Sequence, residues 1–312
     1  MKCNICHQGE RHQLEGGFYD YITRRPFEIW SCDHCGTKVT RGEVQGNFYG
    51  QAYYGSEEGK FSKLLEPIFN ANHNRNANGF YKRFHPKTVL EVGCGRGYIL
   101  SALKKVGCKV QGIESADAAD WILNNPEVDV HGVRDGESWP VADESIDLVI
   151  IWHVFEHVSD PVEVLKEMKR VLAPGGTICI SVPNIKSLQA GLQLSSWFHL
   201  DVPRHLYHFS IDGIEQMVDA QGMQIVERKA GDFLQNLYGW YQTFANMMTP
   251  ANNNIVYRFL QGGEPWRSCK NKWLLVVHLL TAPLVVPPAV MGWLIETVSG
   301  RHGSMTLYVS KK

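Results

Sequence analysis

The chain has 312 residues, of which 31 are Lys or Arg and 32 are Asp or Glu, with 44% hydrophobic and 20% charged residues. These proportions are those of ordinary soluble enzymes and exclude a disordered or fibrous chain. At about 150 residues per domain, the length predicts one large domain with an appendage, or two domains. The formal net charge of −1 argues against a nucleic-acid binder, because the contact face of such a protein is strongly basic.

Two pairs of cysteines stand near the start of the chain. Eight cysteines are too few for a disulfide framework, and the opening residues lack the apolar stretch of a secretory signal, so we expect a cytoplasmic protein. Cys3/Cys6 and Cys32/Cys35 each leave a two-residue gap, which lets both thiolates of a pair face one tetrahedral ion. Residues 1–45 are therefore predicted to form a zinc-ribbon module with a structural Zn²⁺. A redox dithiol and unliganded thiols are the alternatives.

A β-α-β pattern begins at Pro86. KTVLEVG is typical of a buried strand, CGRGYILSALKKVG of a glycine-rich turn that leads into a helix, and KVQGIE of a second strand. Glycines in this turn permit close approach of a ligand to the backbone. A dinucleotide fingerprint would have its third glycine at the position of Tyr98, so the pattern does not favour a pyrophosphate ligand.

Two acidic residues narrow the choice of ligand further. Glu91 stands just before the glycine turn, where a carboxylate repels a pyrophosphate but attracts an ammonium or sulfonium group. Glu114 ends the second strand, where an acidic side chain can accept both hydroxyls of a ribose. The two together indicate a nucleoside ligand that carries a cationic group.

The order of the following segments resembles that of one family. Between about residues 53 and 184 the chain resembles the class I S-adenosylmethionine-dependent methyltransferases. The matching segments are VLEVGCGRGY, GIE, SWPVADESIDLVIIWHVFEHVSDP and VLAPGGTICISVPN. The resemblance implies an α/β fold with a doubly wound, seven-stranded Rossmann-like sheet over residues 46–230, completed by a final strand at residues 304–312.

The resemblance also implies where S-adenosylmethionine binds. The residues expected around its methionine part are Glu91, Gly93, Gly95 and Gly97. Glu114 would hold the ribose, and Asp135 would lie near the adenine amino group, although VHGVRDGES departs from the usual Gly-Asp-Ala. Tyr53 and Tyr54 resemble an aromatic lead-in that closes over the cofactor in many relatives. Packing of an N-terminal helix onto the sheet is the alternative role for these two tyrosines.

A histidine-rich segment, WFHLDVPRHLYHFS, follows the fifth strand at the rim of the sheet where ligands bind. Methyl transfer is an in-line displacement that depends mainly on positioning, and a hydroxyl acceptor also needs a histidine or carboxylate base. His199 and His205 are candidate bases, with Asp201 to orient the base and Arg204 to clamp an anionic group of the acceptor. In the alternative, Arg204 pairs with Asp201 and the histidines only pack the loop.

A second cluster follows the fourth strand. His153 stands where the fourth motif of the family approaches the transferring methyl, so it is a further candidate base. Glu156 and His157 belong to a stretch that is common in the family, where capping and packing are the usual roles. The region also resembles the ubiquinone-pathway O-methyltransferases, in which acids and the histidine here are associated with a divalent ion, and this is the alternative role.

Residues 231–303 are predicted to be a helical insertion before the last strand. Residues 273–295 carry no formal charge and are long enough to span a membrane. We expect Pro283 and the pair Pro287–Pro288 to break this segment into two short pieces, and the last strand must return to the same sheet. The segment is therefore predicted to make peripheral membrane contact as an interfacial hairpin. A lid over the acceptor pocket and a dimer interface are the alternatives, so the oligomeric state stays open.

Taken together, the motifs predict an enzyme that transfers a methyl group from S-adenosylmethionine to a small or lipid-linked acceptor, most simply to an oxygen of a sugar or phenol. A zinc-ribbon ribosomal RNA methyltransferase is an alternative that the absence of a basic run disfavours. A non-catalytic cofactor-binding scaffold protein is another alternative, which the intact glycine and acid motifs disfavour.

Overall fold

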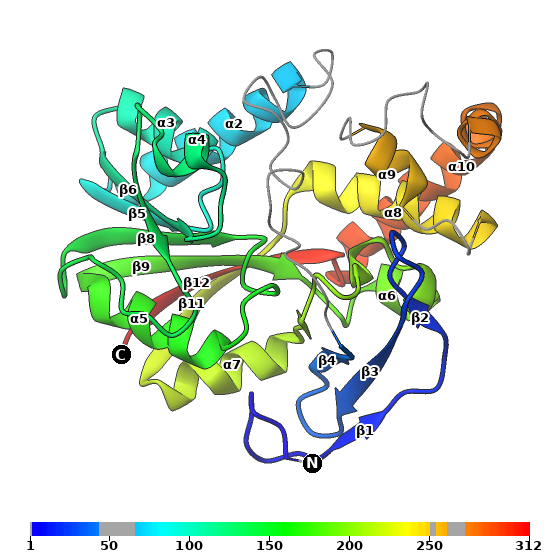
Figure 1. The fold of residues 1–312 in the computed structure, drawn as a ribbon, viewed down its shortest axis with the longest axis horizontal. Helices are drawn as coiled ribbons and strands as arrows, with labels where there is room; N and C mark the ends of the chain where they lie inside the picture. Colours follow the sequence, from blue (N-terminus) through cyan, green and yellow to red (C-terminus); the bar gives the residue numbers. More distant parts are fainter. Residues whose placement is uncertain (1, 44–65, 250–253, 261–271) are drawn as a thin grey trace.

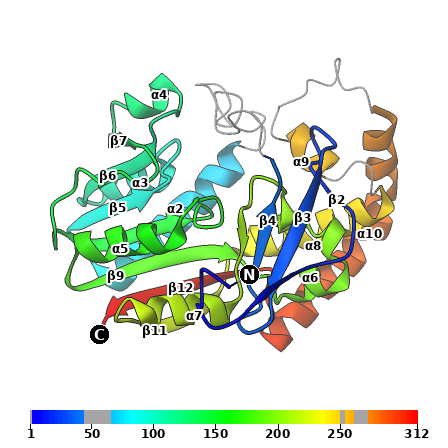
Figure 2. The same cartoon turned by 60° about the horizontal axis from the view of Figure 1, so that its bottom comes forward.

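The structure is a computed structural model, and it describes residues 2–43, 66–249, 254–260 and 272–312. A large sheet carries helices on both faces, and a small N-terminal sheet packs beside one end of it (Figure 1). A group of helices lies at the same end, on the side away from strand β7 (Figures 1 and 2).

The large sheet has seven strands in the order β11-β12-β9-β8-β5-β6-β7. Their bounds are β5 (Thr88–Val92), β6 (Lys109–Ser115), β7 (Asp129–Val133), β8 (Ile146–Trp152), β9 (Leu172–Pro183), β11 (Met223–Ala230) and β12 (Ser304–Lys311). Strands β5 to β9 are parallel, whereas β12 runs antiparallel to both β9 and β11. The chain runs outward from β5 to β7 and then returns to β8. The β5–β8 junction is therefore a switch point, and ligands of such sheets bind at its carboxyl end.

Helices cover both faces of this sheet because its central strands are apolar on both sides. The helices and short turns of this part are α2 (Glu66–Phe84), α3 (Tyr98–Lys105), α4 (Asp120–Leu123), α5 (Pro161–Val171), α6 (Leu188–Leu192), η1 (Leu194–Ser196), η2 (Phe198–Leu200) and α7 (Ile211–Ala220). Helices α2 and α3 lie on one face, and α5 and α7 on the other (Figure 1). The predicted doubly wound, seven-stranded fold is confirmed.

The N-terminal sheet shares a strand with the larger part of the protein. It contains β1 (Arg11–Gln13), β2 (Phe18–Tyr19), β3 (Pro26–Cys32), β4 (Lys38–Arg41) and β10 (Tyr207–His208). Strand β10 lies within the histidine-rich segment, and it pairs with β4 through Tyr207 opposite Val39. The backbone N–H of Thr40 also donates to the carbonyl of Leu206, at 2.9 Å. The cysteine-bearing module is thus joined to the histidine loop by a sheet.

Between β11 and β12, the described residues form three helices: α8 (Phe233–Met248), α9 (Ile255–Leu260) and α10 (Lys272–Ser299). The predicted break at Pro283 and Pro287–Pro288 is wrong, because α10 continues through all three prolines. Each proline removes one backbone donor, but the other residues of this 28-residue helix keep theirs, and its inner side packs on α8. The expected hairpin is therefore replaced by one long helix.

Candidate functional site

The glycine turn between β5 and α3 forms the first wall of the site. Gly93, Gly95 and Gly97 have φ values of 70°, 50° and 70°, in the left-handed region that favours glycine. A Cβ atom on Gly93 would lie 2.4 Å from a methyl carbon of Val154, so the turn packs tightly against the loop after β8. A Cβ atom on Gly95 would have no described atom within 4 Å. The turn is thus closed at Gly93 and open to a ligand at Gly95.

Two buried carboxylates flank this turn. Glu114 at the end of β6 accepts hydrogen bonds from the backbone N–H groups of Gly95, at 2.7 Å, and Ser115, at 2.8 Å. Glu91 in β5 is 5% exposed, and its Oε2 atom has no hydrogen-bond partner in the described part of the chain. Burial raises the pKa of Glu91 well above its usual value, and the nearby charge of Glu114 adds to this effect. A cationic ligand group beside these two acids would stabilise both of their charges.

Of the other expected cofactor residues, the structure describes only Asp135, which lies apart from this turn. Asp135 is exposed in the turn after β7, at the same edge of the sheet, since β7 runs parallel to β6. Tyr53 and Tyr54 lie outside the described residues. The structure therefore brings Glu91, the three glycines and Glu114 together, and it places Asp135 two strands away from β5.

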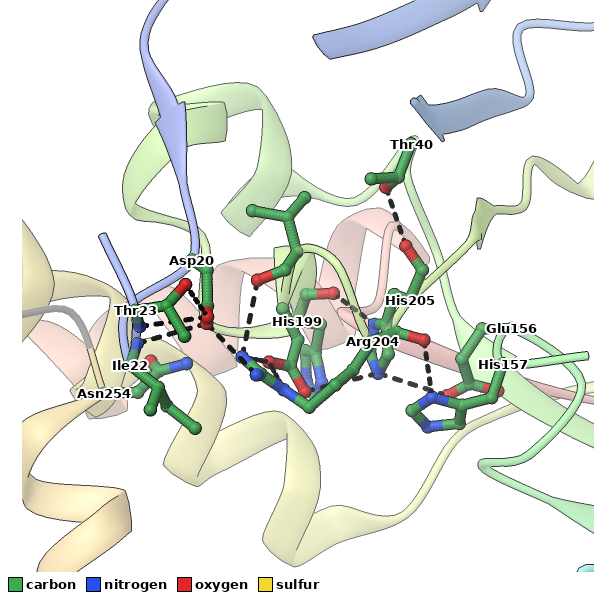
Figure 3. Close-up of polar contacts among 12 residues, drawn as sticks. Asp20, Ile22, Thr23, Thr40, Glu156, His157, His199, Arg204, His205 and Asn254 are labelled. Atoms are coloured by element: carbon green, nitrogen blue, oxygen red, sulfur yellow. Dashed lines mark hydrogen bonds and ion pairs between the residues drawn. The ribbon is translucent and has the colours of Figure 1, made fainter. Parts of the chain in front are cut away.

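The two histidine clusters meet at Glu156. His153 follows β8, and its Nδ1 atom lies 3.5 Å from Oε1 of Glu156. The Nε2 atom of His205, on the loop after η2, lies 3.9 Å from the same oxygen. The rings of His153 and His199 are nearly parallel, with centroids 6.4 Å apart. Residues about 50 positions apart in the sequence thus form one buried group, much of which is drawn in Figure 3.

The electrostatics of this group distinguish its histidines. Burial alone would raise the pKa of Glu156, but the nearby imidazoles of His153, His157 and His205 lower it to about 2. Glu156 is therefore a carboxylate at neutral pH. Burial, together with the charges of His153 and His205, lowers the pKa of His199 to about 3. His199 is accordingly neutral at pH 7 and only weakly basic.

Comparisons with known proteins decide the family. A family model described as a methyltransferase domain matches residues 61–228, more than half of the chain. The chain belongs to this family. It is a class I S-adenosylmethionine-dependent methyltransferase, as the motifs predicted, and its cofactor is S-adenosylmethionine.

Individual relatives match parts of this methyltransferase. A Mycolicibacterium smegmatis protein named "Probable S-adenosylmethionine-dependent methyltransferase" is 37% identical over 100 residues, which are 31% of this chain and 38% of that protein. A ubiquinone biosynthesis O-methyltransferase of Cereibacter sphaeroides is 27% identical over 173 residues, 50% of this chain and 68% of that one. A crystal structure of a methyltransferase from Archaeoglobus fulgidus has a TM-score of 0.46 at 17% identity, over 80% of this chain and 98% of that one.

The contacts of Arg204 agree with the alternative prediction, in which it pairs with Asp201. Its Nε atom donates to Oδ1 of Asp201 at 2.7 Å, and its Nη1 atom lies 3.1 Å from Oδ1 of Asp20. Its guanidinium carbon stands 4.2 Å from the centre of the Tyr21 ring. The side chain is 5% exposed, so these contacts hold it inside the protein (Figure 3).

Asp20 was not predicted from the sequence. It also accepts hydrogen bonds from the backbone N–H groups of Ile22 and Thr23 and from the hydroxyl of Thr23, at 3.1, 3.0 and 2.6 Å. The sequence signal that could have marked Asp20 is its residue type, since an Asp side chain can bond the backbone two residues further on and form a turn. It did not indicate that the turn reaches Arg204.

Gln189 was also missed, since no motif includes it. Gln189 is fully buried, and its Nε2 atom donates to the carbonyl of Asn236 and to Glu296, both at 3.0 Å. Its Oε1 atom and the Nε2 atom of His199 have no hydrogen-bond partner among the described residues. A Cβ atom on Gly239 would lie 2.6 Å from the first of these atoms and 3.2 Å from the second. Two unpaired polar atoms therefore meet where α8 passes the histidine loop.

The four cysteines fit a tetrahedral metal site. Their Sγ atoms all lie within 4.8 Å of one another, with 4.0 Å between Cys3 and Cys35 and 3.7 Å between Cys6 and Cys32. Zn–S bonds of about 2.3 Å in a tetrahedron separate the sulfurs by about 3.8 Å, which is close to these values. The guanidinium of Arg11 lies 3.5 Å from Sγ of Cys3, where it would offset part of the negative charge of four thiolates.

A second group of possible metal ligands lies in the histidine cluster. The ligand atoms of Glu156, His157 and His205 also lie within 4.8 Å of one another. The Nδ1–H groups of the two histidines donate hydrogen bonds to backbone carbonyls of the loop. The acceptor for His157 is Arg204, at 2.9 Å, and the acceptor for His205 is His199, at 2.7 Å. The donor types are compatible with the divalent-ion alternative.

Proposed function

We propose that this methyltransferase transfers a methyl group to a hydroxyl oxygen of a small or lipid-linked acceptor, most simply a sugar or phenol, with His153 as the general base. The observation that carries the proposal is the pairing of His153 with Glu156. Nδ1 of His153 faces the buried carboxylate at 3.5 Å, while its Nε2 atom is buried without a partner among the described residues. The pair stands after β8, beside the switch point of the sheet.

The chemistry follows from this arrangement. Bound S-adenosylmethionine supplies an electrophilic methyl group on a sulfonium ion. Glu156 holds the proton of His153 on Nδ1, which leaves the lone pair of Nε2 to accept the proton of an acceptor hydroxyl. The imidazolium that forms lies beside a carboxylate, which stabilises its charge. His199 is the weaker base, because its pKa is lowered to about 3, and it is better suited to donate a hydrogen bond to the acceptor.

Arg204, Asp201 and His205 are assigned positioning roles. Arg204 is paired with Asp201 and Asp20, so it holds the loop that carries His199. The Nε2 atom of His205 lies 3.9 Å from carboxylate oxygens of both Glu156 and Asp201. His205 therefore connects the Arg204–Asp201 ion pair to Glu156, the partner of the base. These contacts fix the distance between His153 and the loop, which an in-line transfer requires.

The surroundings of the loop support an aromatic or lipid-linked acceptor. The ring of Phe198 has its centroid 5.3 Å from that of Tyr238 and 5.2 Å from that of Tyr257. The similarity to a ubiquinone biosynthesis O-methyltransferase agrees with a phenolic acceptor. We further propose that the four cysteines hold a structural Zn²⁺ and that the protein works in the cytoplasm, on the inner face of the membrane.

A base test distinguishes this assignment from the alternatives. His153→Ala should lower kcat by roughly 10²- to 10³-fold with a polyprenyl-catechol acceptor, while the Kd for S-adenosylmethionine stays near that of the wild type. His199→Ala should lower kcat less, and His12→Ala, at an exposed position of β1, should have no effect. Calorimetry and transfer of a labelled methyl group measure these quantities. An unchanged kcat in His153→Ala would reject His153 as the base.

A further inference from the structure

The outward side of α10 carries a continuous stripe of apolar side chains. Trp273, Leu280, Leu284, Met291 and Val298 are 57 to 90% exposed. Their spacings of seven, four, seven and seven residues place them on one line along a helix. We call this line, with the exposed apolar residues beside it, the outer face of α10. Figure 2 shows the first part of α10 along the outer edge of the molecule, whereas its last turns come back toward the start of β12.

The inward side of the same helix holds two buried polar side chains, Glu296 and His278. Glu296 is fully buried and accepts hydrogen bonds from Gln189, from the backbone N–H of Gly303 and from the indole of Trp240. His278 is also buried, and its Nε2 atom lies 3.2 Å from the hydroxyl of Thr249. A surface helix of a water-soluble protein has the opposite arrangement. The outer face of α10 is therefore suited to an apolar environment.

The connections of α10 show how it can meet such an environment. The helix has 28 residues and a mean hydropathy of 2.0 in its most apolar window, so it is long and apolar enough to cross a membrane. However, the chain returns within a few residues of its end to β12, which lies between β9 and β11 in the large sheet. Crossing would also expose the hydrogen-bonded Glu296 to lipid, at a high cost. The helix is thus arranged to lie along a membrane surface.

The charges at the ends of α10 favour a lipid surface over a second copy of the chain as the partner of its outer face. Residues 272–299 are all described, and their only basic residue is Lys272 and their only acidic residue the buried Glu296. Arg301 follows the helix and is exposed. A two-fold pair of α10 helices would bring cation against cation, since Lys272 would meet either Lys272 or Arg301 of the other copy. Anionic headgroups complement both ends.

We propose that the outer face of α10 docks this methyltransferase peripherally on a bilayer that contains anionic lipid. The face is one helix away from the histidine loop. Helix α8 contacts α10 on one side, where Gly292 leaves room for the Trp240 ring. It contacts the loop on its other side, where Thr243 accepts a hydrogen bond from the backbone N–H of Phe198 at 3.1 Å. Docking therefore brings the acceptor side of the enzyme close to the lipid, and it does not depend on the acceptor proposed above.

Flotation with lipid vesicles tests the proposal. Full-length protein should float with vesicles of phosphatidylethanolamine and phosphatidylglycerol, and less with vesicles of phosphatidylcholine alone. Leu280→Glu/Leu284→Glu should lower the bound fraction by about ten-fold or more, because two carboxylates replace two apolar side chains at the lipid contact. The matched control is Ile68→Glu/Val226→Glu, which adds two charges at exposed apolar positions of α2 and β11 and should float like the wild type.

Measurements without lipid keep the result interpretable. Both double variants should retain the wild-type Tm and affinity for S-adenosylmethionine, since all four positions are exposed. The proposal is overturned if the wild type stays in solution, if Leu280→Glu/Leu284→Glu floats like the control, or if neutral vesicles bind as well as anionic ones. It is also overturned if sedimentation shows a dimer that Leu280→Glu/Leu284→Glu dissociates and no vesicle binding is seen. That outcome would assign the outer face of α10 to a second copy of the chain.

Discussion

The predicted cofactor-binding half and the proposed acceptor-binding half of this methyltransferase, here called the cofactor half and the acceptor half, are built in different ways. The cofactor half uses one stretch of chain, in which Glu91 to Glu114 form a strand, a glycine turn, a helix and a strand. The acceptor half is assembled from separate segments that supply Asp20, His153 with Glu156, the loop around Arg204, and α8. The first half depends on local backbone geometry and the second on contacts between distant residues. Substitutions in the two halves should therefore fail in different ways.

The largest expected effect belongs to the acceptor half. Arg204→Ala would leave Asp201 and Asp20 buried without their partner, and breaking a buried pair in this way costs about 3 to 5 kcal/mol of stability. Denaturant unfolding should show this loss, with kcat lowered as well. Arg228→Ala, which removes an exposed pair with Glu215, should cost about 1 kcal/mol or less. Equal effects of the two substitutions would mean that the Arg204 pairs contribute no more than surface contacts.

The cofactor half should respond through ligand affinity. Gly93→Ala adds a Cβ atom 2.4 Å from Val154 at a residue with φ of 70°, so the turn must shift. We expect the Kd for S-adenosylmethionine to rise by roughly 100-fold, about 3 kcal/mol, by calorimetry. Gly107→Ala is the matched control, since φ is 97° there and no described atom lies within 4 Å of the added carbon. It should cost about 1 to 2 kcal/mol of stability with the Kd unchanged.

A substitution in the four-cysteine site tests whether the N-terminal module affects catalysis. Cys32→Ser should lower bound zinc from one ion per chain and make residues 2–43 sensitive to protease, as metal sites of this kind support local folding. Because β4 pairs with β10, loss of zinc should also lower kcat. The Kd for S-adenosylmethionine should change by less than about three-fold. Cys108→Ser, at a buried cysteine outside the cluster, should keep its zinc. Retention of one zinc by Cys32→Ser would contradict the four-cysteine site.

The smallest expected effect, when taken per pH unit, is a change of stability with pH. Burial lowers the pKa of His208 from 6.5 to about 3, and the charges of His205 and Lys38 act in the same direction. Between these two pKa values, the unfolded chain therefore binds one more proton at His208 than the folded protein does. The stability that neutral His208 contributes is thus fully present above pH 6.5 and is lost as the pH falls toward 3. Between pH 6 and 4, His208→Gln should reduce the slope of the free energy of unfolding by about 1.4 kcal/mol per pH unit. An unchanged slope would show that His208 is protonated in the folded protein.

Much of the cofactor half could be predicted from the sequence. Strand and helix periods, the three turn glycines and the acids at the strand ends all lie within 24 residues, where local sterics and alternation decide the structure. The cysteine spacing likewise predicted a cluster that the structure brings together. The acceptor half was predicted only as a set of candidate residues, because sequence order does not show which charges will meet.

The sequence by itself determined the doubly wound sheet, the glycine turn with its two acids, and the four paired thiols. Only the tertiary structure decided that Arg204 is held by Asp20, a residue 184 positions away, and that His153 and His205 share Glu156. It also decided that α10 continues through its prolines with Glu296 and His278 facing inward. The physical reason is the range of the interactions. Backbone geometry is set by neighbouring residues, whereas the partner of a buried charge and the side on which a helix packs depend on segments far apart in the chain.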